Sequence, residues 1–105
     1  MTPLRCLPAL ALLAACASPA PEFFGAVRHD LELGGIRFSV FWKGERAEVI
    51  RLGYLTRAQR APVPALMIRA AEQATGCRVL PGSVVTGLPG DTGEARMDLD
   101  CGAGG

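Results

Sequence analysis

The chain has 105 residues, of which 50% are hydrophobic and 20% are charged, so its length and composition fit one folded domain and exclude a disordered chain. Without Arg5, the one basic residue of the first 15, ten Lys and Arg (11 minus 1) balance ten Asp and Glu. A net charge close to zero gives no electrostatic source for nonspecific binding to nucleic acid.

The first 17 residues have the order of a secretory signal peptide. A start with one positive charge precedes an apolar run over residues 7–15, and small residues follow. The apolar stretch at residues 6–17 contains Pro8 and is shorter than the roughly 20 residues of a membrane-spanning helix. We therefore expect a signal peptide over residues 1–15 and no permanent transmembrane helix.

The end of this segment, Leu13-Ala14-Ala15-Cys16, resembles the lipobox of bacterial lipoproteins. The resemblance implies that the Cys16 thiol receives a diacylglyceryl group, that signal peptidase II cuts between Ala15 and Cys16, and that the new amino group is acylated, for instance with palmitate. Small side chains suit a narrow protease site, and a thiol is the nucleophile that forms a thioether. Two or three acyl chains would anchor the chain stably, since each buried methylene contributes about 0.8 kcal/mol.

A second cleavage site overlaps the first. Ala15-Cys16-Ala17 fits the A-x-A pattern of the ordinary signal peptidase, which would release a soluble protein that begins at Ser18. If Cys16 is lipidated, the residue after it, Ala17, is not an aspartate. In the enterobacterial lipoprotein pattern this implies sorting to the outer membrane, with the domain facing the periplasm.

Beyond Cys16 the chain divides into three parts. Residues 16–22 include Pro19 and Pro21, which favour a flexible, extended tether. Residues 23–101 form the predicted domain, and the glycine-rich residues 102–105 form a disordered tail.

The cysteines predict one disulfide bond. Signal removal takes Cys6 and acylation uses Cys16, which leaves Cys77 and Cys101 as an even pair in an oxidising compartment. The alternative, a zinc site, lacks a C-x-x-C motif and has only His29 as a histidine ligand.

Alternating apolar and polar residues predict three strands, over residues 27–33, 36–43 and 47–54. Gly34-Gly35 suits a two-residue hairpin, and residues 43–46 form a second turn. These adjacent hairpins predict a three-stranded antiparallel meander.

The second half of the domain contains one helix. After a connection over residues 56–64, good helix formers fill residues 65–75, and Gly76 can cap the helix end. We expect a broken or bulged strand over residues 77–80 and 84–88, and a last strand over residues 95–101. The order β-β-β-α-β-β predicts a small α+β domain, with one helix packed on a mainly antiparallel sheet.

No catalytic residue, metal site or cofactor is predicted. His29 is the natural candidate for acid/base chemistry, because the unperturbed histidine side chain changes charge near neutrality. It lies in phase with Leu31 and Leu33, as a strand residue at the sheet margin does. Neither Ser39 nor Ser83 lies in a G-x-S-x-G motif.

Acidic residues gather near the C-terminus. Asp91, Glu94, Asp98 and Asp100 could hold a cation, but their spacing differs from a calcium loop and fits the solvated face of a strand.

Arginines are concentrated between the third strand and the connection. Arg46, Arg51, Arg57 and Arg60 form a candidate patch for an anionic ligand, although arginine on exposed strands and loops also serves solubility.

The sequence therefore predicts a small membrane-anchored lipoprotein of the bacterial envelope, with a non-enzymatic accessory or interaction domain and an envelope protein as partner. An open sheet edge could accept a partner strand. The alternatives are a small envelope hydrolase or cell-wall enzyme that uses His29, and a soluble secreted binding or inhibitor protein.

Overall fold

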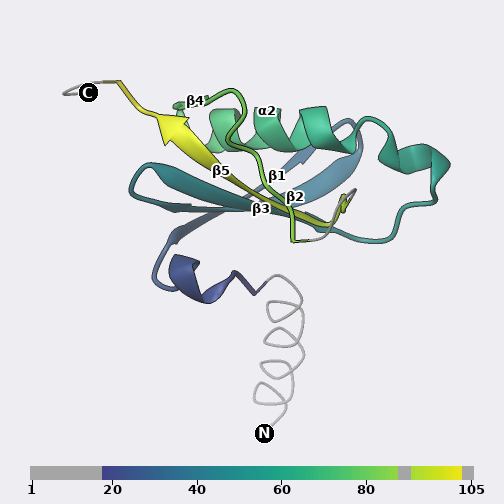
Figure 1. Ribbon diagram of the computed structural model, residues 1–105. Helices are drawn as coiled ribbons and strands as arrows, with labels where there is room; N and C mark the ends of the chain where they lie inside the picture. Colours follow the sequence, from purple (N-terminus) through teal and green to yellow (C-terminus); the bar gives the residue numbers. More distant parts are fainter. Residues whose placement is uncertain (1–17, 88–90, 103–105) are drawn as a thin grey trace, which may run out of the picture.

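The computed structural model describes residues 18–87 and 91–102 (Figure 1). In this part of the chain five strands form one antiparallel sheet in the order β1-β2-β3-β5-β4, and the helix α2 packs on one face. The predicted α+β fold is confirmed. The elements are, in chain order, η1 (Pro21–Phe23), β1 (Val27–Leu33), β2 (Ile36–Lys43), β3 (Arg46–Leu52), η2 (Ala58–Arg60), α2 (Val63–Thr75), β4 (Arg78–Val79) and β5 (Glu94–Asp100).

The first three strands form the predicted meander. Leu33 pairs with Ile36 across Gly34 and Gly35, whose φ angles of 60° and 78° are the left-handed values that a two-residue hairpin requires. β3 ends at Leu52, two residues before the predicted end, and pairs with β5 on its other side. β3 therefore lies between β2 and β5 in the interior of the sheet.

Helix α2 begins two residues earlier than predicted. The first N–H groups of a helix have no partner inside it, so proline, which lacks the N–H, is compatible with the first helical turn. The prolines on either side of Val63 therefore allow the helix to begin there. The helix ends at Gly76, which has φ 74° and donates its N–H to the Glu72 carbonyl at 2.8 Å. One stripe of the helix faces the sheet and is buried: Val63, Met67, Ala70 and Ala71.

The main core lies between α2 and the sheet. Each central strand contributes the residues that alternate onto the helix side, as a period of two requires. The largest fully buried side chains of this layer are Phe38, Met67, Met97, Val40, Val49 and Val63.

The strand that follows the helix is shorter than predicted. Only Arg78–Val79 pairs with β5 as β4, and beyond it Val85 forms a single bridge with Arg96. The turn at Pro81-Gly82 interrupts the backbone pairing. There the Ser83 hydroxyl donates to the Leu80 carbonyl and accepts from the Asp98 N–H of β5 at 3.0 Å. Residue 88, the predicted end of this strand, lies outside the described residues.

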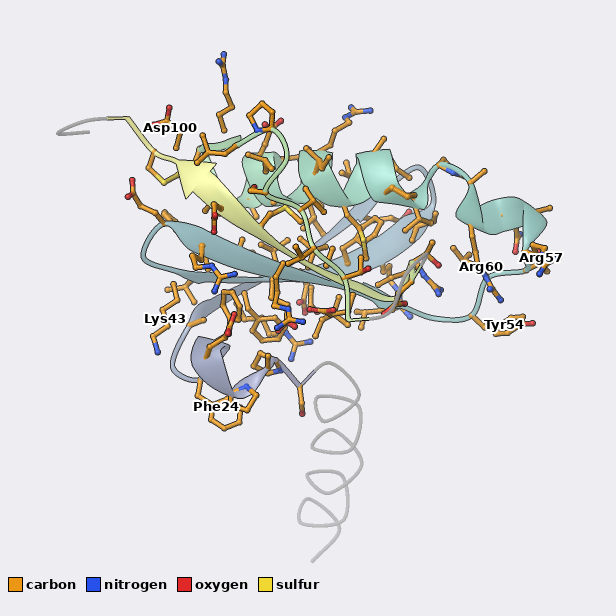
Figure 2. The ribbon with its side chains drawn as sticks, in the orientation of Figure 1. Phe24, Lys43, Tyr54, Arg57, Arg60 and Asp100 are labelled. Carbon is orange, nitrogen blue, oxygen red and sulfur yellow. A yellow bond between two sulfur atoms is a disulfide. The ribbon has the colours of Figure 1, made fainter. Side chains whose placement is uncertain are left out.

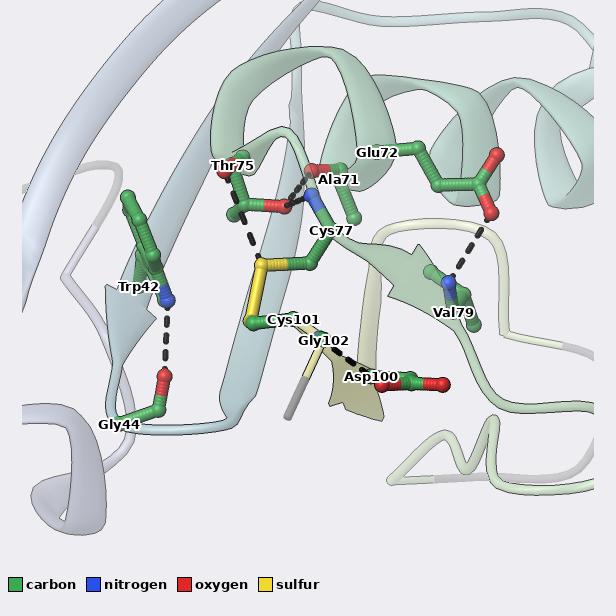
Figure 3. The surroundings of a disulfide bond; sticks show 10 residues. All are labelled: Trp42, Gly44, Ala71, Glu72, Thr75, Cys77, Val79, Asp100, Cys101 and Gly102. Atoms are coloured by element: carbon green, nitrogen blue, oxygen red, sulfur yellow. Dashed lines mark hydrogen bonds between the residues drawn. A yellow bond between two sulfur atoms is a disulfide. The ribbon is translucent and has the colours of Figure 1, made fainter. Parts of the chain in front are cut away.

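The predicted disulfide between Cys77 and Cys101 is present and joins the end of α2 to the end of β5 (Figure 3). Thr75 strengthens this corner, because its hydroxyl donates to the Ala71 carbonyl and accepts from the Cys77 N–H. Nearby, Glu72 accepts a hydrogen bond from the Val79 N–H at 3.0 Å. The helix end is thus fixed to β4 and to the end of β5.

Replacing both cysteines, as Cys77→Ala/Cys101→Ala, is expected to lower the free energy of unfolding by about 3 kcal/mol. The bond closes a loop of sequence separation 24, and its removal gives the unfolded chain more conformational freedom. Urea unfolding can be followed through Trp42, the single tryptophan, which packs partly buried against the core. Reduced wild-type protein should unfold at the same urea midpoint as the double variant. Equal midpoints for the oxidised wild type and the double variant would contradict the expectation.

Candidate functional site

The sheet face opposite α2 is covered by residues 18–26, called here the N-terminal segment (Figure 1). The Phe23 ring of η1 is 1% exposed and packs against Phe41 of β2, while Ile50 and Leu52 of β3 complete this second apolar cluster. The sequence predicted an extended tether up to residue 22. The described part of that stretch is instead bound to the sheet, because the second face has apolar side chains that need cover.

A second set of contacts joins this segment to the sheet. The guanidinium of Arg46 lies 5.7 Å from the centre of the Phe23 ring. It also forms ion pairs with Glu22, at 2.8 Å, and with Asp98 of β5, at 3.0 Å. Arg46 therefore links the N-terminal segment to two strands, although pairs this exposed contribute little stability each.

Beneath the N-terminal segment lie Glu48, Glu94 and Arg96, called here the carboxyl cluster. Glu48 is 2% exposed, and its Oε1 accepts a hydrogen bond from the Ala20 backbone N–H at 2.8 Å. Arg96 Nε lies 2.9 Å from Glu94 Oε2, as an ion pair without hydrogen-bond geometry. Glu48 is the register partner of Arg96, which puts their side chains on one face.

Burial raises the pKa of Glu48 from 4.5 to about 7, and the hydrogen bond and negative charge of Glu94 act in the same direction. The Ala20 N–H and the Arg96 charge oppose this shift but do not cancel it. Near pH 7 Glu48 is therefore protonated in part of the molecules. Protonated Glu48 can donate to Glu94 while its other oxygen accepts from Ala20.

This arrangement holds a chain segment. Glu48 is enclosed by the segment whose backbone it binds. Neither of the two surface hollows described below is lined by a member of the carboxyl cluster. The cluster thus fixes where the N-terminus enters the domain.

The sequence analysis did not predict that Glu48 and Phe23 would be buried on the second face of the sheet, although one pattern in the sequence indicated it. On β2 and β3, Phe41, Ile50 and Leu52 are apolar on the face that a one-sided sheet would leave to water. Apolar residues on both faces of a central strand indicate a second covering element.

Ser39 and His29 do not form a catalytic pair. Ser39 is fully buried, and its hydroxyl donates to Asp30 Oδ1 at 2.7 Å. Arg28 bonds the same carboxyl at 2.9 Å. Burial acts to raise the pKa of Asp30, but the hydrogen bonds from Arg28 and Ser39 outweigh it and lower that pKa. His29 is exposed and points to the opposite face of β1, because neighbouring strand residues alternate.

The four predicted arginines do not form one patch. Arg46 and Arg51 are five positions apart on β3, so they point to opposite faces, and Arg51 bonds the carbonyls of Thr92 and Gly53. Arg57 and Arg60 lie together and exposed at η2, with Tyr54, which is 85% exposed, near them (Figure 2). Only these last two arginines form a joint cationic surface.

The predicted acidic residues are separated by local bonds. Asp98 pairs with Arg46, Asp91 accepts from the Gly93 N–H, and Asp100 accepts from the Gly102 N–H. Over residues 18–87 and 91–102 no group of three or more His, Cys, Asp or Glu side chains is placed to hold a metal ion.

Among the described residues, two of the surface hollows are well formed and open to solvent. One, of about 280 Å³, lies at the hairpin end of the meander and is lined by Asp30, Leu31, Glu32, Arg37, Phe38 and Leu52. The other, of about 190 Å³, lies beside α2 and is lined by Pro64, Met67, Val84, Thr86, Asp91, Thr92 and Ala95. Neither contains His29 or an arginine of the predicted patch.

The predicted cleavage and lipidation residues, Ala15 and Cys16, lie outside the described residues. In the part of the chain that the structure describes, no helix is long and apolar enough to cross a membrane. Comparison with protein-family models, with curated proteins and with solved structures found no significant match to this chain.

Truncating the buried ring of the N-terminal segment, as Phe23→Ala, is expected to lower the free energy of unfolding by about 3 kcal/mol, since it leaves a cavity over Phe41. The neighbouring Phe24 is 60% exposed, so Phe24→Ala is a matched control with an expected change within about 0.5 kcal/mol. Urea unfolding measures both changes. Equal losses in the two variants would show that the segment is not bound as described.

Stability should fall as pH rises from about 4.5 to about 7, because folded Glu48 keeps a proton that the unfolded residue releases near pH 4.5. At about 1.4 kcal/mol per pKa unit, the loss is on the order of 3 kcal/mol. Glu48→Gln still accepts from Ala20 and cannot ionise. It should flatten the profile and exceed wild-type stability above pH 7, as measured by urea unfolding across this range.

Glu32→Gln, an exposed change on β1, is the control for that experiment and should keep the wild-type slope. A Glu48→Gln profile as steep as that of the wild type would contradict the assignment to Glu48.

Proposed function

We propose that this chain is a lipid-anchored lipoprotein of the bacterial envelope, with a non-enzymatic accessory or interaction domain on the periplasmic side. The observation that carries the proposal is the motif Leu13-Ala14-Ala15-Cys16 at the end of a short apolar segment. Ala17 in the position after Cys16 supports the outer membrane over the inner membrane as its location.

The disulfide supports export from the cytoplasm. Bonds such as Cys77–Cys101 form and persist in oxidising compartments, which include the bacterial periplasm, and are rare in the cytosol. A domain of this size has a small core and gains proportionally from such a bond. The predicted export signal and the disulfide are thus both consistent with the periplasm.

The placement of the polar side chains supports a binding role over a hydrolytic one. A Ser–His–Asp mechanism needs its three groups in hydrogen-bond reach of one another. Here His29 lies on one face of β1, while Ser39 and Asp30 bond each other on the other face. Glu48, with a pKa suited to proton transfer, is enclosed.

Two exposed features are available to a partner protein. β1 is an edge of the sheet, with no strand beyond it among the described residues. The loop with Tyr54, Arg57 and Arg60 presents residue types that are enriched in protein interfaces. Residues 49–71 contain four arginines and no Asp or Glu, which suits a partner with acidic groups.

The test is intact mass spectrometry of protein expressed in a bacterial host, with wild type compared with Cys16→Ser in membrane and soluble fractions. We expect the wild type to be recovered from membranes, with the mass of a chain that begins at Cys16 plus acyl chains. The variant lacks the thiol that accepts the diacylglyceryl group, so it should carry no lipid mass and remain an uncleaved precursor.

The alternative of a soluble exported protein gives a different result. An unlipidated chain that begins at Ser18, with the same mass in wild type and Cys16→Ser, would overturn the proposal. The same substitution on the other signal-region cysteine, Cys6→Ser, is the control and should leave lipidation unchanged.

A further inference from the structure

Two consecutive phenylalanines of the N-terminal segment point in different directions. Phe23 is 1% exposed and covers the sheet, whereas Phe24 is 60% exposed and ends η1. The Phe24 carbonyl accepts a hydrogen bond from Lys43 Nζ at 2.9 Å, so an ammonium is held at the backbone of Phe24 (Figure 2). The fold does not use this exposed ring.

The length of chain between Cys16 and the sheet is short. Ala20 is held on the sheet face opposite α2 by its bond to Glu48, and Cys16 precedes it by four residues. Four residues reach at most about 14 Å when fully extended. On the proposed function, the acyl chains would hold this face of the domain within that distance of the bilayer.

We infer that Phe24 and Lys43 form the surface with which the anchored domain contacts the membrane. The Phe24 ring enters the boundary between head groups and acyl chains, and the Lys43 ammonium, which has donors left after its bond to Phe24, meets lipid phosphates. This inference rests on the proposed lipidation of Cys16. The sheet face with the carboxyl cluster then points to the bilayer and α2 points away from it.

A single aromatic ring is sufficient to orient the domain, because the lipid anchor already holds the domain at the membrane and no free energy of association has to be supplied by the ring. An exposed phenylalanine alone is a normal surface feature and would not recruit a free protein to lipid. Once the domain is tethered, contact is intramolecular and only its orientation remains to be decided. A tenfold preference for one orientation corresponds to about 1.4 kcal/mol, which partial burial of one aromatic ring can supply.

The chain has a matched control at another site. Tyr54 is also exposed and aromatic and lies near cationic side chains, Arg57 and Arg60. It belongs to the connection between β3 and α2, far in sequence from the anchor, and Figure 2 shows it at the other end of the sheet from Phe24. If exposure and charge alone determined membrane contact, Tyr54 would serve as well as Phe24.

The experiment uses lipidated full-length protein in vesicles of phosphatidylethanolamine and phosphatidylglycerol, with and without brominated acyl chains as a quencher. Phe24→Trp and Tyr54→Trp are compared with the parent, which contains only Trp42. We expect brominated lipid to quench the emission added by Phe24→Trp and to leave the emission added by Tyr54→Trp unchanged. Both positions are exposed, so both variants should keep the wild-type unfolding midpoint.

The role of Lys43 is tested in the same vesicles. Lys43→Gln added to Phe24→Trp should reduce the quenching, whereas Arg57→Gln added to Phe24→Trp should leave it unchanged. Equal quenching in both double variants would overturn the part assigned to Lys43.

The outcomes separate this inference from the proposed function, because intact mass is measured on the same preparations. An acylated protein in which Phe24→Trp is not quenched, or in which Tyr54→Trp is quenched instead, overturns the membrane-contact surface and leaves lipidation in place. A protein that carries no acyl chains overturns both.

Discussion

The hydrogen bond from the Ala20 N–H to the Glu48 carboxyl, at 2.8 Å, determines how the chain enters the domain. It is made on the sheet face that α2 does not cover, where Phe41 and Ile50 would otherwise meet water. Because Ala20 is fixed there, Phe23 reaches Phe41 and Glu22 reaches Arg46. The part of the β-sheet around Phe41 is consequently buried on both faces, by the 13-residue helix on one side and by the N-terminal segment with η1 on the other.

Binding a backbone segment with a buried carboxylate is unfavourable in itself, since removing a charge from water costs several kcal/mol. Two features reduce that cost here. Glu48 can keep its proton, so it need not be charged when buried, and Glu94 is compensated by Arg96. The hydrogen bond fixes the position of the N-terminal segment on the sheet. Apolar contacts with Phe41 alone would allow several positions of the segment, whereas a hydrogen bond to one carboxyl allows one. On the proposed function, this fixed position matters because only four residues separate Ala20 from Cys16.

The packing of α2 on the sheet could be predicted from the sequence, whereas the packing of the N-terminal segment on the other face could not. Alternation along β2, the Gly34-Gly35 turn and the even cysteine pair predicted the meander and the Cys77–Cys101 bond, because each is a local or compositional signal. The N-terminal segment has no periodicity, and its prolines favoured a solvated tether. The arginine patch failed for a geometric reason, as Arg46 and Arg51 lie an odd number of positions apart on one strand. Whether a carboxyl is enclosed depends on contacts between residues 28 positions apart, such as Ala20 and Glu48, which no local pattern contains.

The short entry segment also determines which surfaces stay open. On the proposed function, the sheet face that holds the N-terminal segment is turned to the membrane, so a partner must approach α2, the connection with Arg57 and Arg60, or the edge strand β1. β1 carries Arg28, Asp30 and Glu32 on the face shared with the N-terminal segment, and charges on an edge strand discourage indiscriminate pairing. The connection has the opposite character, because Arg57 and Arg60 have no acidic residue near them in the sequence. Charge therefore favours the connection over the edge as the surface for a specific partner.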